Sequence, residues 1–283
     1  MKPFIKKFKE VGIKDVAEAG GKNASLGEMI RNLVPKGVRI PDGFIVTATA
    51  YGDFLDEAKV GDINLKKFIK ETLKGLDTKN LSDLARRGKL IRETMKRAEL
   101  PEELNRQIIK SYKEMEKQYG ENADVAVRSS ATAEDLPGAS FAGEHETYLN
   151  IRGAIELLEA VKSAMASLFT NRAISYRVDK GFDHFKVALS VGVQKMVRSD
   201  KGCSGVMFTV DTESGFRDLV IINGVWGLGE MIVQGEVTPD EFLVFKKTGA
   251  IIDKRIADKS KKMIYSEGRG IKKTKIVSVS LRD

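Results

Sequence analysis

Residues 125–150 read VAVRSSATAEDLPGASFAGEHETYLN, and the character of the sequence changes at this point. The apolar residues that end at Arg128 predict a short buried strand. Small and hydroxylated residues follow, so their backbone amides are sterically accessible. A guanidinium at a strand end beside such a loop is suited to wrapping a triphosphate, and we expect Ser129 and Thr132 to take part. The length of the loop through Gly143 favours a functional lid over a surface loop in which Arg128 pairs with a neighbouring acid.

The part of the chain before this stretch has mainly helical periodicity. In residues 20–33, GGKNASLGEMIRNL, apolar residues recur on one helical face, and Asn23 is a candidate N-cap. The segment GFIVTAT at residues 43–49 predicts a strand. The apolar face of the first helix consists of Leu26, Met29, Ile30 and Leu33. Further helices are expected at residues 65–73, 81–95 and 101–120.

Strands dominate the chain after residue 180. Two helices are expected first, near residues 155–169 and 171–179. Six strands are then expected, in VALSVGVQKMV, SGVMFTV, DLVIING, DEFLVFK, AIIDKRI and KIVSVSL. Helices followed by a run of strands favour an α+β fold over a wound parallel fold. We therefore expect a helix-rich lobe at residues 1–190 and a strand-rich lobe at residues 191–283. The sequence stops directly after the last expected strand, which suggests a fragment, and a naturally short protein is the alternative.

The composition is that of a globular protein with an excess of basic residues. Lysine and arginine number 48 against 40 aspartates and glutamates, which gives a net charge of +8. That excess suits a polyphosphate or a nucleic acid, although a lysine-rich solvated surface is the more common cause. The basic residues alternate with acids and lack interleaved aromatic residues, so we do not expect nucleic acid to be a partner.

Cysteine content and hydropathy exclude other classes of protein. Cys203 is the only cysteine, which rules out an intrachain disulfide and a cysteine-rich zinc site. The first ten residues lack the apolar region of a signal peptide, and no apolar run approaches the roughly 20 residues that span a bilayer. We expect no membrane association and a cytoplasmic location.

Three further segments contain candidate ligand-binding residues. Gly20 and Gly21 allow close approach of a ligand to the start of a helix, where Lys22 would add a positive charge for a phosphate. Taken alone, two glycines and a lysine before a helix more often form an ordinary turn than a phosphate-binding site. Three residues at a strand end, Gln194, Met196 and Val197, could read and pack against an adenine, although without further context ordinary core strands are the much better explanation. The turn WGLGE presents Glu230. His145 and His184 are expected not to be phosphorylated.

Together these segments resemble the N-terminal nucleotide-binding domain of the phosphoenolpyruvate synthase (pyruvate, water dikinase) family. The strings that carry the resemblance are GGKNASLGEMI, VRSSATAEDLPGASFAGEHETYLN, SLFTNRAISYRV, VALSVGVQKMVRSD, SGVMFTVDTESGF and WGLGEMIVQGEVTPDEF. Pyruvate phosphate dikinases and rifamycin phosphotransferases share the domain type more distantly.

The resemblance implies an ATP-grasp fold, with ATP and Mg²⁺ held between two lobes. Lys22 and Arg128 would contact the phosphates as the catalytic residues, and the loop from Thr132 to Gly143 would cover them. The adenine hinge would be formed by Gln194, Met196 and Val197, and Glu230 would face the ribose.

The family reaction moves the β-phosphoryl group of ATP to a histidine on a mobile domain and then to pyruvate in a barrel domain, releasing AMP and phosphate. The phosphohistidine domain, the pyruvate-binding domain and the acidic pair that holds Mg²⁺ in the family are not found before residue 283. Metal ligands and the oligomeric state therefore remain unassigned. The alternatives are a stand-alone nucleotide-binding or regulatory module without catalysis, and a rifamycin-type phosphotransferase.

Overall fold

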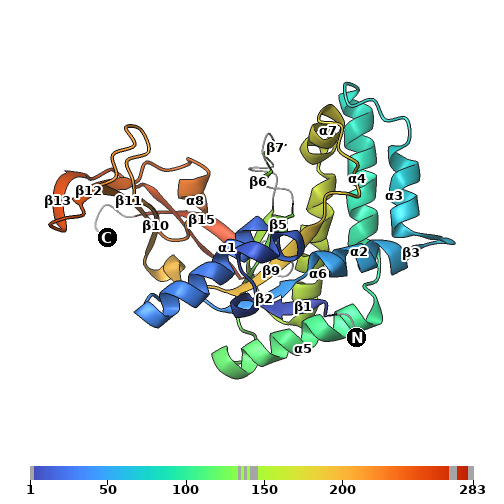
Figure 1. The fold of residues 1–283 in the computed structure, drawn as a ribbon, viewed down its shortest axis with the longest axis horizontal. Helices are drawn as coiled ribbons and strands as arrows, with labels where there is room; N and C mark the ends of the chain where they lie inside the picture. Colours follow the sequence, from blue (N-terminus) through green and yellow to red (C-terminus); the bar gives the residue numbers. More distant parts are fainter. Residues whose placement is uncertain (1–2, 133–134, 137–138, 141–145, 268–272, 280–283) are drawn as a thin grey trace. The chain divides into compact units, whose positions relative to one another are not determined.

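The structure of the protein is a computed structural model that describes residues 3–132, 135–136, 139–140, 146–267 and 273–279 (Figure 1). The chain divides into two compact units between Met196 and Val197. Helices dominate the first unit and strands the second, which confirms the expected α+β class. None of the helices in the described ranges is long and apolar enough to cross a membrane.

The first unit contains an antiparallel five-stranded sheet in the order β1-β2-β9-β5-β8. Its strands are β1 (Ile5–Lys7), β2 (Gly43–Val46), β5 (Val125–Ala131), β8 (Thr147–Ile151) and β9 (Leu189–Lys195). Two short pairs accompany it: β3 (Lys59–Val60) with β4 (Ile63–Asn64), and β6 (Asp135–Leu136) with β7 (Ala139–Ser140).

Seven α-helices lie in the described part of this unit. They are α1 (Val16–Leu33), α2 (Ala48–Glu57), α3 (Leu65–Leu73), α4 (Leu81–Arg97), α5 (Glu102–Tyr119), α6 (Ala154–Ala166) and α7 (Asn171–Asp179). Side chains at their N-termini explain several of the boundaries: Thr47, Asn64, Asn80 and Thr170 each accept a hydrogen bond from a backbone N–H three residues later. The helices expected at 65–73, 81–95, 101–120, 155–169 and 171–179 are all present.

Helices α1 and α6 cover opposite faces of the five-stranded sheet. Successive side chains of a strand point to opposite faces, so Ser130 and Val127 of β5 lie on different sides. The Ser130 hydroxyl contacts the backbone of α1. Val127 is paired with Tyr148 of β8, whose phenol interacts with Ser163 of α6. The site described below lies on the face that carries α1.

The second unit is an antiparallel meander with an additional hairpin. Its four-stranded sheet runs in sequence order through β10 (Cys203–Phe208), β11 (Leu219–Trp226), β12 (Asp240–Phe245) and β13 (Ala250–Arg255). The hairpin consists of β14 (Lys261–Tyr265) and β15 (Thr274–Ser278), and α8 (Glu230–Val233) is a single helical turn. All five strands expected after residue 200 are present, whereas β14 is an additional strand that its mixed pattern did not predict.

Several local expectations were wrong. The strand that was expected to end at Arg128 continues to Ala131, because β5 pairs with β9 as far as Leu189. The strand expected at residues 43–49 ends at Val46, where Thr47 caps α2. The loop after Thr132 contains the two short strands β6 and β7.

The buried face of α1 also differs from the apolar stripe in the sequence. Met29 is 46% exposed, and Leu26, Ile30 and Leu33 are only half-buried. The helix instead buries small residues, mainly Ala19, Ala24 and Gly27, because it lies close against neighbouring backbone. Hydrophobicity alone could not identify this face, since close approach selects residues by size.

The boundary between lobes predicted at residues 190 and 191 falls within β9. That strand pairs with β2 and β5 along its length and belongs to the first compact unit. The predicted division concerned functional lobes and stays a prediction.

Candidate nucleotide-binding site

The glycine pair predicted to approach a ligand lies at a break in α1. Gly20 has φ +72° and ψ 159°, a backbone conformation outside the helical region, so the helical run begins again after it. A Cβ atom at Gly20 would lie 2.3 Å from the carbonyl oxygen of Ser130. Only glycine fits, because the backbone conformation and the close approach to β5 both exclude a side chain.

The helix start after Gly20 is bound by a side chain from β5. The Ser130 hydroxyl accepts hydrogen bonds from the backbone N–H groups of Lys22 at 3.1 Å and Asn23 at 3.4 Å. These are N–H groups of the kind that a helix N-terminus offers to an anion. These two N–H groups are therefore already hydrogen-bonded within the chain, and the expectation that this helix start binds a phosphate stays a prediction.

Asn23 does not cap the helix as predicted. It lies within α1, 4% exposed, and its side-chain amide donates to the Ser190 hydroxyl of β9 at 2.9 Å. The Ser190 hydroxyl in turn donates to the carbonyl oxygen of Ala19. A Cβ atom at Gly192 would lie 2.4 Å from the Asn23 side-chain oxygen, so that glycine makes room for this contact.

Lys22 and Arg128 belong to the same face of the sheet. Ser130, which holds the Lys22 backbone, is two residues from Arg128 along β5, and such residues share a face about 6–7 Å apart. Both Lys22 and Arg128 are exposed. The structure thus places the Lys22 backbone against the sheet face to which Arg128 belongs.

Arg128 is the single exposed residue of an otherwise buried strand. Opposite it stand Gly192 of β9 and Thr147 of β8, neither of which has a charge. Within the described ranges, no acidic side chain forms an ion pair or hydrogen bond with its guanidinium. A cation in this position is open to an anionic ligand.

The other predicted phosphate-site residues lie differently. Ser129 is buried on the opposite face, where its hydroxyl donates to the Glu146 carbonyl oxygen at 3.4 Å. The Thr132 hydroxyl and N–H both hydrogen bond to the carbonyl oxygen of Ala188, at 3.1 and 3.0 Å. Gly143 and His145 are outside the described residues.

Tyr148 on β8 fixes the segment near Arg128. Burial raises the pKa of the Tyr148 phenol, and its hydrogen bond to the Glu146 carboxylate raises that pKa further. The phenol therefore stays protonated and donates to Glu146. The Glu146 carboxylate is thus hydrogen-bonded to Tyr148, two residues further along the chain.

The predicted hinge begins at the end of β9. The Gln194 amide donates to the Pro41 carbonyl oxygen at 3.0 Å. Met196 donates its N–H to the Asp124 carbonyl oxygen at 3.0 Å and accepts from the Lys195 ammonium at 3.1 Å. The backbone of Met196 is thus already hydrogen-bonded, which leaves its side chain for packing. Val197, 61% exposed, begins the second compact unit.

Glu230 is the first residue of α8 in the second unit. Its carboxylate accepts a hydrogen bond from the Gln234 amide at 3.1 Å. Gly227, with φ +77°, forms the tight turn before it, and that turn is held by the Ser204 hydroxyl, which donates to the Gly227 carbonyl oxygen at 2.7 Å. The tight turn is therefore present and Glu230 follows it, half-buried, whereas its role toward a ligand stays a prediction.

No metal site is preformed in the described ranges. Among those residues, no group of three or more His, Cys, Asp and Glu side chains could hold an ion. The His184 side chain has a hydrogen-bond partner within the fold, because its Nδ1 accepts a hydrogen bond from Arg177 Nε at 3.0 Å.

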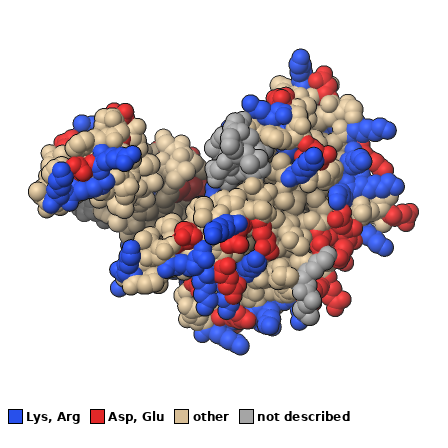
Figure 2. All heavy atoms as spheres, viewed as in Figure 1, with Lys and Arg blue, Asp and Glu red and all other residues tan. Residues whose placement is uncertain are grey.

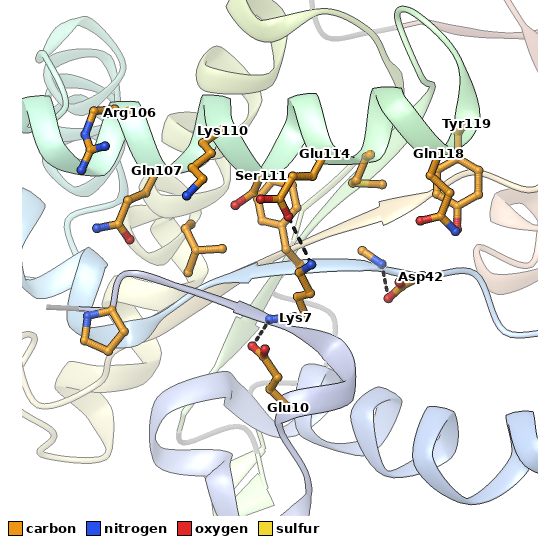
Figure 3. A pocket seen from close by; sticks show the side chains of 15 residues that line it. Lys7, Glu10, Asp42, Arg106, Gln107, Lys110, Ser111, Glu114, Gln118 and Tyr119 are labelled. Atoms are coloured by element: carbon orange, nitrogen blue, oxygen red, sulfur yellow. Dashed lines mark hydrogen bonds and ion pairs between the residues drawn. The ribbon is translucent and has the colours of Figure 1, made fainter. Parts of the chain in front are cut away.

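A groove of about 610 Å³ lies elsewhere on the first unit, between α5 and the strands β1 and β2 (Figure 3). None of the sequence-predicted site residues lines it. Its charges are largely satisfied locally: Lys7 pairs with Glu114 at 3.1 Å, and Arg106 pairs with Glu103 at 2.6 Å. Basic and acidic side chains are interspersed over the face of the protein in Figure 2, as the sequence predicted.

Comparison with known proteins gives consistent matches across the chain. The family described as pyruvate phosphate dikinase, AMP/ATP-binding domain, matches residues 16–283. The chain is 56% identical over 280 residues to the phosphoenolpyruvate synthase of Aquifex aeolicus, covering 97% of this chain and 32% of that protein. It is 52% identical to the phosphoenolpyruvate synthase of Helicobacter pylori, with 93% and 32% covered.

The phosphoenolpyruvate synthase of Escherichia coli is 49% identical over 269 residues, with 93% of this chain and 33% of that protein covered. The chain therefore spans about a third of the length of these curated relatives. Because the family match extends over nearly all of the sequence, the chain belongs to the family of pyruvate phosphate dikinase AMP/ATP-binding domains.

Proposed function

We propose that the protein binds ATP with its phosphates against the Lys22 and Arg128 side chains, as the nucleotide-binding part of a phosphoenolpyruvate synthase. The observation that carries this proposal is the placement of an exposed lysine and an exposed arginine on one face of the central sheet, linked through Ser130. Two cations on a rigid sheet can neutralise and orient a polyphosphate, which is most of what phosphoryl transfer requires of a protein.

The remaining nucleotide contacts follow from the family resemblance. The ATP-grasp fold that the resemblance implies would hold the nucleotide between two lobes, with the segment from Thr132 to Gly143 as a lid. In the adenine hinge, Met196 would contribute its side chain, since its N–H and carbonyl groups are already hydrogen-bonded. Gln194 and Val197 would flank it, and Glu230 would face the ribose.

Mg²⁺ would reach the site with the nucleotide. The described residues offer no cluster of carboxylates that could hold the ion by themselves. Mg²⁺ commonly binds through substrate phosphates and few protein ligands, so a nucleotide-carried ion fits these residues. No residue of this chain is assigned to it.

The overall reaction would be that named for the relatives. The β-phosphoryl group would pass to a histidine on another domain and then to pyruvate, with one water molecule consumed, giving phosphoenolpyruvate, AMP and phosphate. Lys22 and Arg128 would act in the first step only, by holding the phosphate chain in position and offsetting its charge. Such an enzyme is expected in the cytoplasm.

Calorimetric titration with Mg·ATP tests the proposed site. Lys22→Met and Arg128→Gln should each weaken ATP binding by about 10- to 100-fold, because each removes a charge-assisted contact to phosphate. Lys89→Met is the matched control, since Lys89 is an exposed lysine on α4 with a long ion pair of 3.8 Å to Glu93. Unchanged affinity in both site variants would reject the placement.

Formation of AMP separates the enzyme from a binding module. The chain would be incubated with ATP and the portion of a phosphoenolpyruvate synthase that contains the acceptor histidine. Production of AMP supports the enzymatic function, whereas ATP binding without AMP would favour a nucleotide-binding module without catalysis.

A further inference from the structure

Two buried serines on neighbouring strands hold the turn that presents Lys22. Ser130 of β5 and Ser190 of β9 are directly paired in the sheet, and both are completely buried. Both hydroxyl groups contact α1, and the Ser190 hydroxyl also lies 3.4 Å from the Ser130 carbonyl oxygen on the neighbouring strand. Burying a hydroxyl in a central sheet costs free energy unless the hydroxyl is hydrogen-bonded. The hydrogen bonds to α1 therefore explain how serines can occupy these two positions.

The two hydroxyls hold opposite sides of the Gly20 break. Ser190 donates to the carbonyl oxygen of Ala19, before the break, and accepts from the Asn23 side chain at 2.9 Å. Ser130 accepts from the N–H groups of Lys22 and Asn23, after the break. The backbone on both sides of Gly20 is therefore fixed to the sheet, and the Lys22 Cα is fixed with it.

This arrangement changes how a phosphate can be bound. At a helix N-terminus with unoccupied N–H groups, an anion binds to the backbone. Here the Ser130 hydroxyl occupies the N–H groups of Lys22 and Asn23, so recognition falls to the Lys22 ammonium and the Arg128 guanidinium. The backbone of Arg128 is part of β5, and the backbone of Lys22 is hydrogen-bonded to β5 through Ser130. The sheet therefore sets the relative position of the two backbones.

We propose that Ser130 and Ser190 are positioning residues that fix the Gly20–Asn23 turn on the sheet and thereby place the Lys22 ammonium beside Arg128 for the nucleotide phosphates. This inference rests on the proposed function. It adds that the hydroxyl of Ser130 acts through Lys22 and does not contact the nucleotide.

A double-mutant cycle on the 283-residue chain tests the inference. Binding of ATP and of adenosine would be measured by calorimetry for the wild type, Ser130→Ala, Lys22→Met and the double variant. Ser130→Ala should weaken ATP binding about tenfold, the effect of losing one buried hydrogen bond, and leave adenosine binding unchanged within about twofold. In the Lys22→Met background, Ser130→Ala should change ATP affinity by less than about twofold, because the positioned group is gone.

Ser167→Ala is the matched control for a general folding defect. Ser167 is a buried serine whose hydroxyl donates to the Ala164 carbonyl oxygen at 2.7 Å, away from the predicted site. It should lower the melting temperature without changing ATP affinity. If Ser130→Ala does not fold, Ser190→Ala removes the second anchor and has the same expected non-additivity with Lys22→Met.

Each outcome distinguishes the inference from the proposed function. If the wild type fails to bind ATP, or if neither Lys22→Met nor Arg128→Gln weakens binding, the proposed site itself is wrong. If Arg128→Gln weakens binding but Lys22→Met does not, the positioning role is wrong, because there is no Lys22 contact to position. If Lys22→Met weakens binding but Ser130→Ala does not, or if the two losses simply add, the positioning role is wrong and the site stands. Tighter ATP binding by Ser130→Ala would also overturn the inference, since it would show that the freed backbone N–H groups bind phosphate.

Discussion

The sheets of the two compact units differ sharply in burial. In the first unit, Val125, Val127, Val191 and Val193 of β5 and β9 are fully buried. In the second unit, Met207 of β10 is 61% exposed, and the strands β10–β13 are half-buried or exposed along almost their whole length. An exposed residue therefore stands out as a candidate site residue in the first sheet, whereas in the second sheet exposure is the ordinary state of a residue.

This difference explains why Arg128 can be recognised as a site residue. On β5 it is the only exposed position, so a charged side chain there needs a ligand, a partner or a functional reason. An exposed charge such as Arg255 on β13, which pairs with Glu241 at 3.5 Å, needs no such explanation. Rigid, buried surroundings also hold a binding group in place more effectively than a half-exposed sheet can.

The largest expected effect comes from identical truncations in the two sheets. Ile45→Ala in β2 should lower the free energy of unfolding by about 2–5 kcal/mol, because Ile45 is completely buried and a cavity would remain. Ile252→Ala in β13, where the side chain is 58% exposed, should cost less than about 0.5 kcal/mol. Urea unfolding of both variants makes the measurement, and equal losses would contradict the contrast between the sheets.

A second comparison uses two glycines with nearly equal φ. Gly20 has φ +72° and is in close contact with Ser130, whereas Gly249, with φ +70°, has nothing within 4 Å of an added Cβ. Gly20→Ala should cost about 3 kcal/mol or more, from backbone strain and the steric clash together, whereas Gly249→Ala should cost about 1 kcal/mol from strain alone. Thermal unfolding would measure both. A similar cost at the two positions would mean that the close approach at Gly20 is not rigid.

The smallest effect concerns acid stability. Burial and, to a smaller extent, the neighbouring Arg177 guanidinium lower the pKa of His184 to about 4 from its ordinary 6.5, although Asp183 opposes the shift. Because the folded protein keeps His184 neutral, its contribution to stability is complete above pH 6.5. This contribution is lost as the pH falls from 6.5 toward 4, because in that range His184 binds a proton in the unfolded chain but not in the folded one.

With allowance for partial exposure of the ring, the loss should be about 1–2 kcal/mol. Melting temperatures recorded from pH 7 to pH 4 would show it, and His184→Gln should flatten the curve across this range. A wild-type curve that is already flat there would contradict the expectation.

The second unit should respond to acid at a lower pH. Burial raises the pKa of Asp240, but hydrogen bonds from the Lys259 ammonium and the Ala257 N–H outweigh it and leave that pKa below its ordinary 3.8. Stability from this carboxylate is present above pH 3.8 and is lost only as the pH falls through the lowered pKa. His184→Gln should leave this low-pH loss in place.

The sequence by itself determined the α+β class, most of the helices and strands, and the family. Helical spacing and β-rich runs are local signals, and the motif strings are specific enough to indicate the family without a structure. The same local chemistry marked Lys22 and Arg128 as candidate phosphate ligands. A glycine pair before a helix and a charged residue at the end of an apolar run can both be read from adjacent residues.

Only the tertiary structure decided how those candidates are held. The hydrogen bond from the Lys22 N–H to Ser130 joins residues 108 positions apart, and no local pattern predicts such a contact. For the same reason the sequence suggested Asn23 as a cap and placed Ser129 with Arg128, whereas strand alternation puts Ser129 on the other face. The sequence specifies which chemical groups are present, but the pairing of β5 with β9 and the path of α1 determine which of them meet.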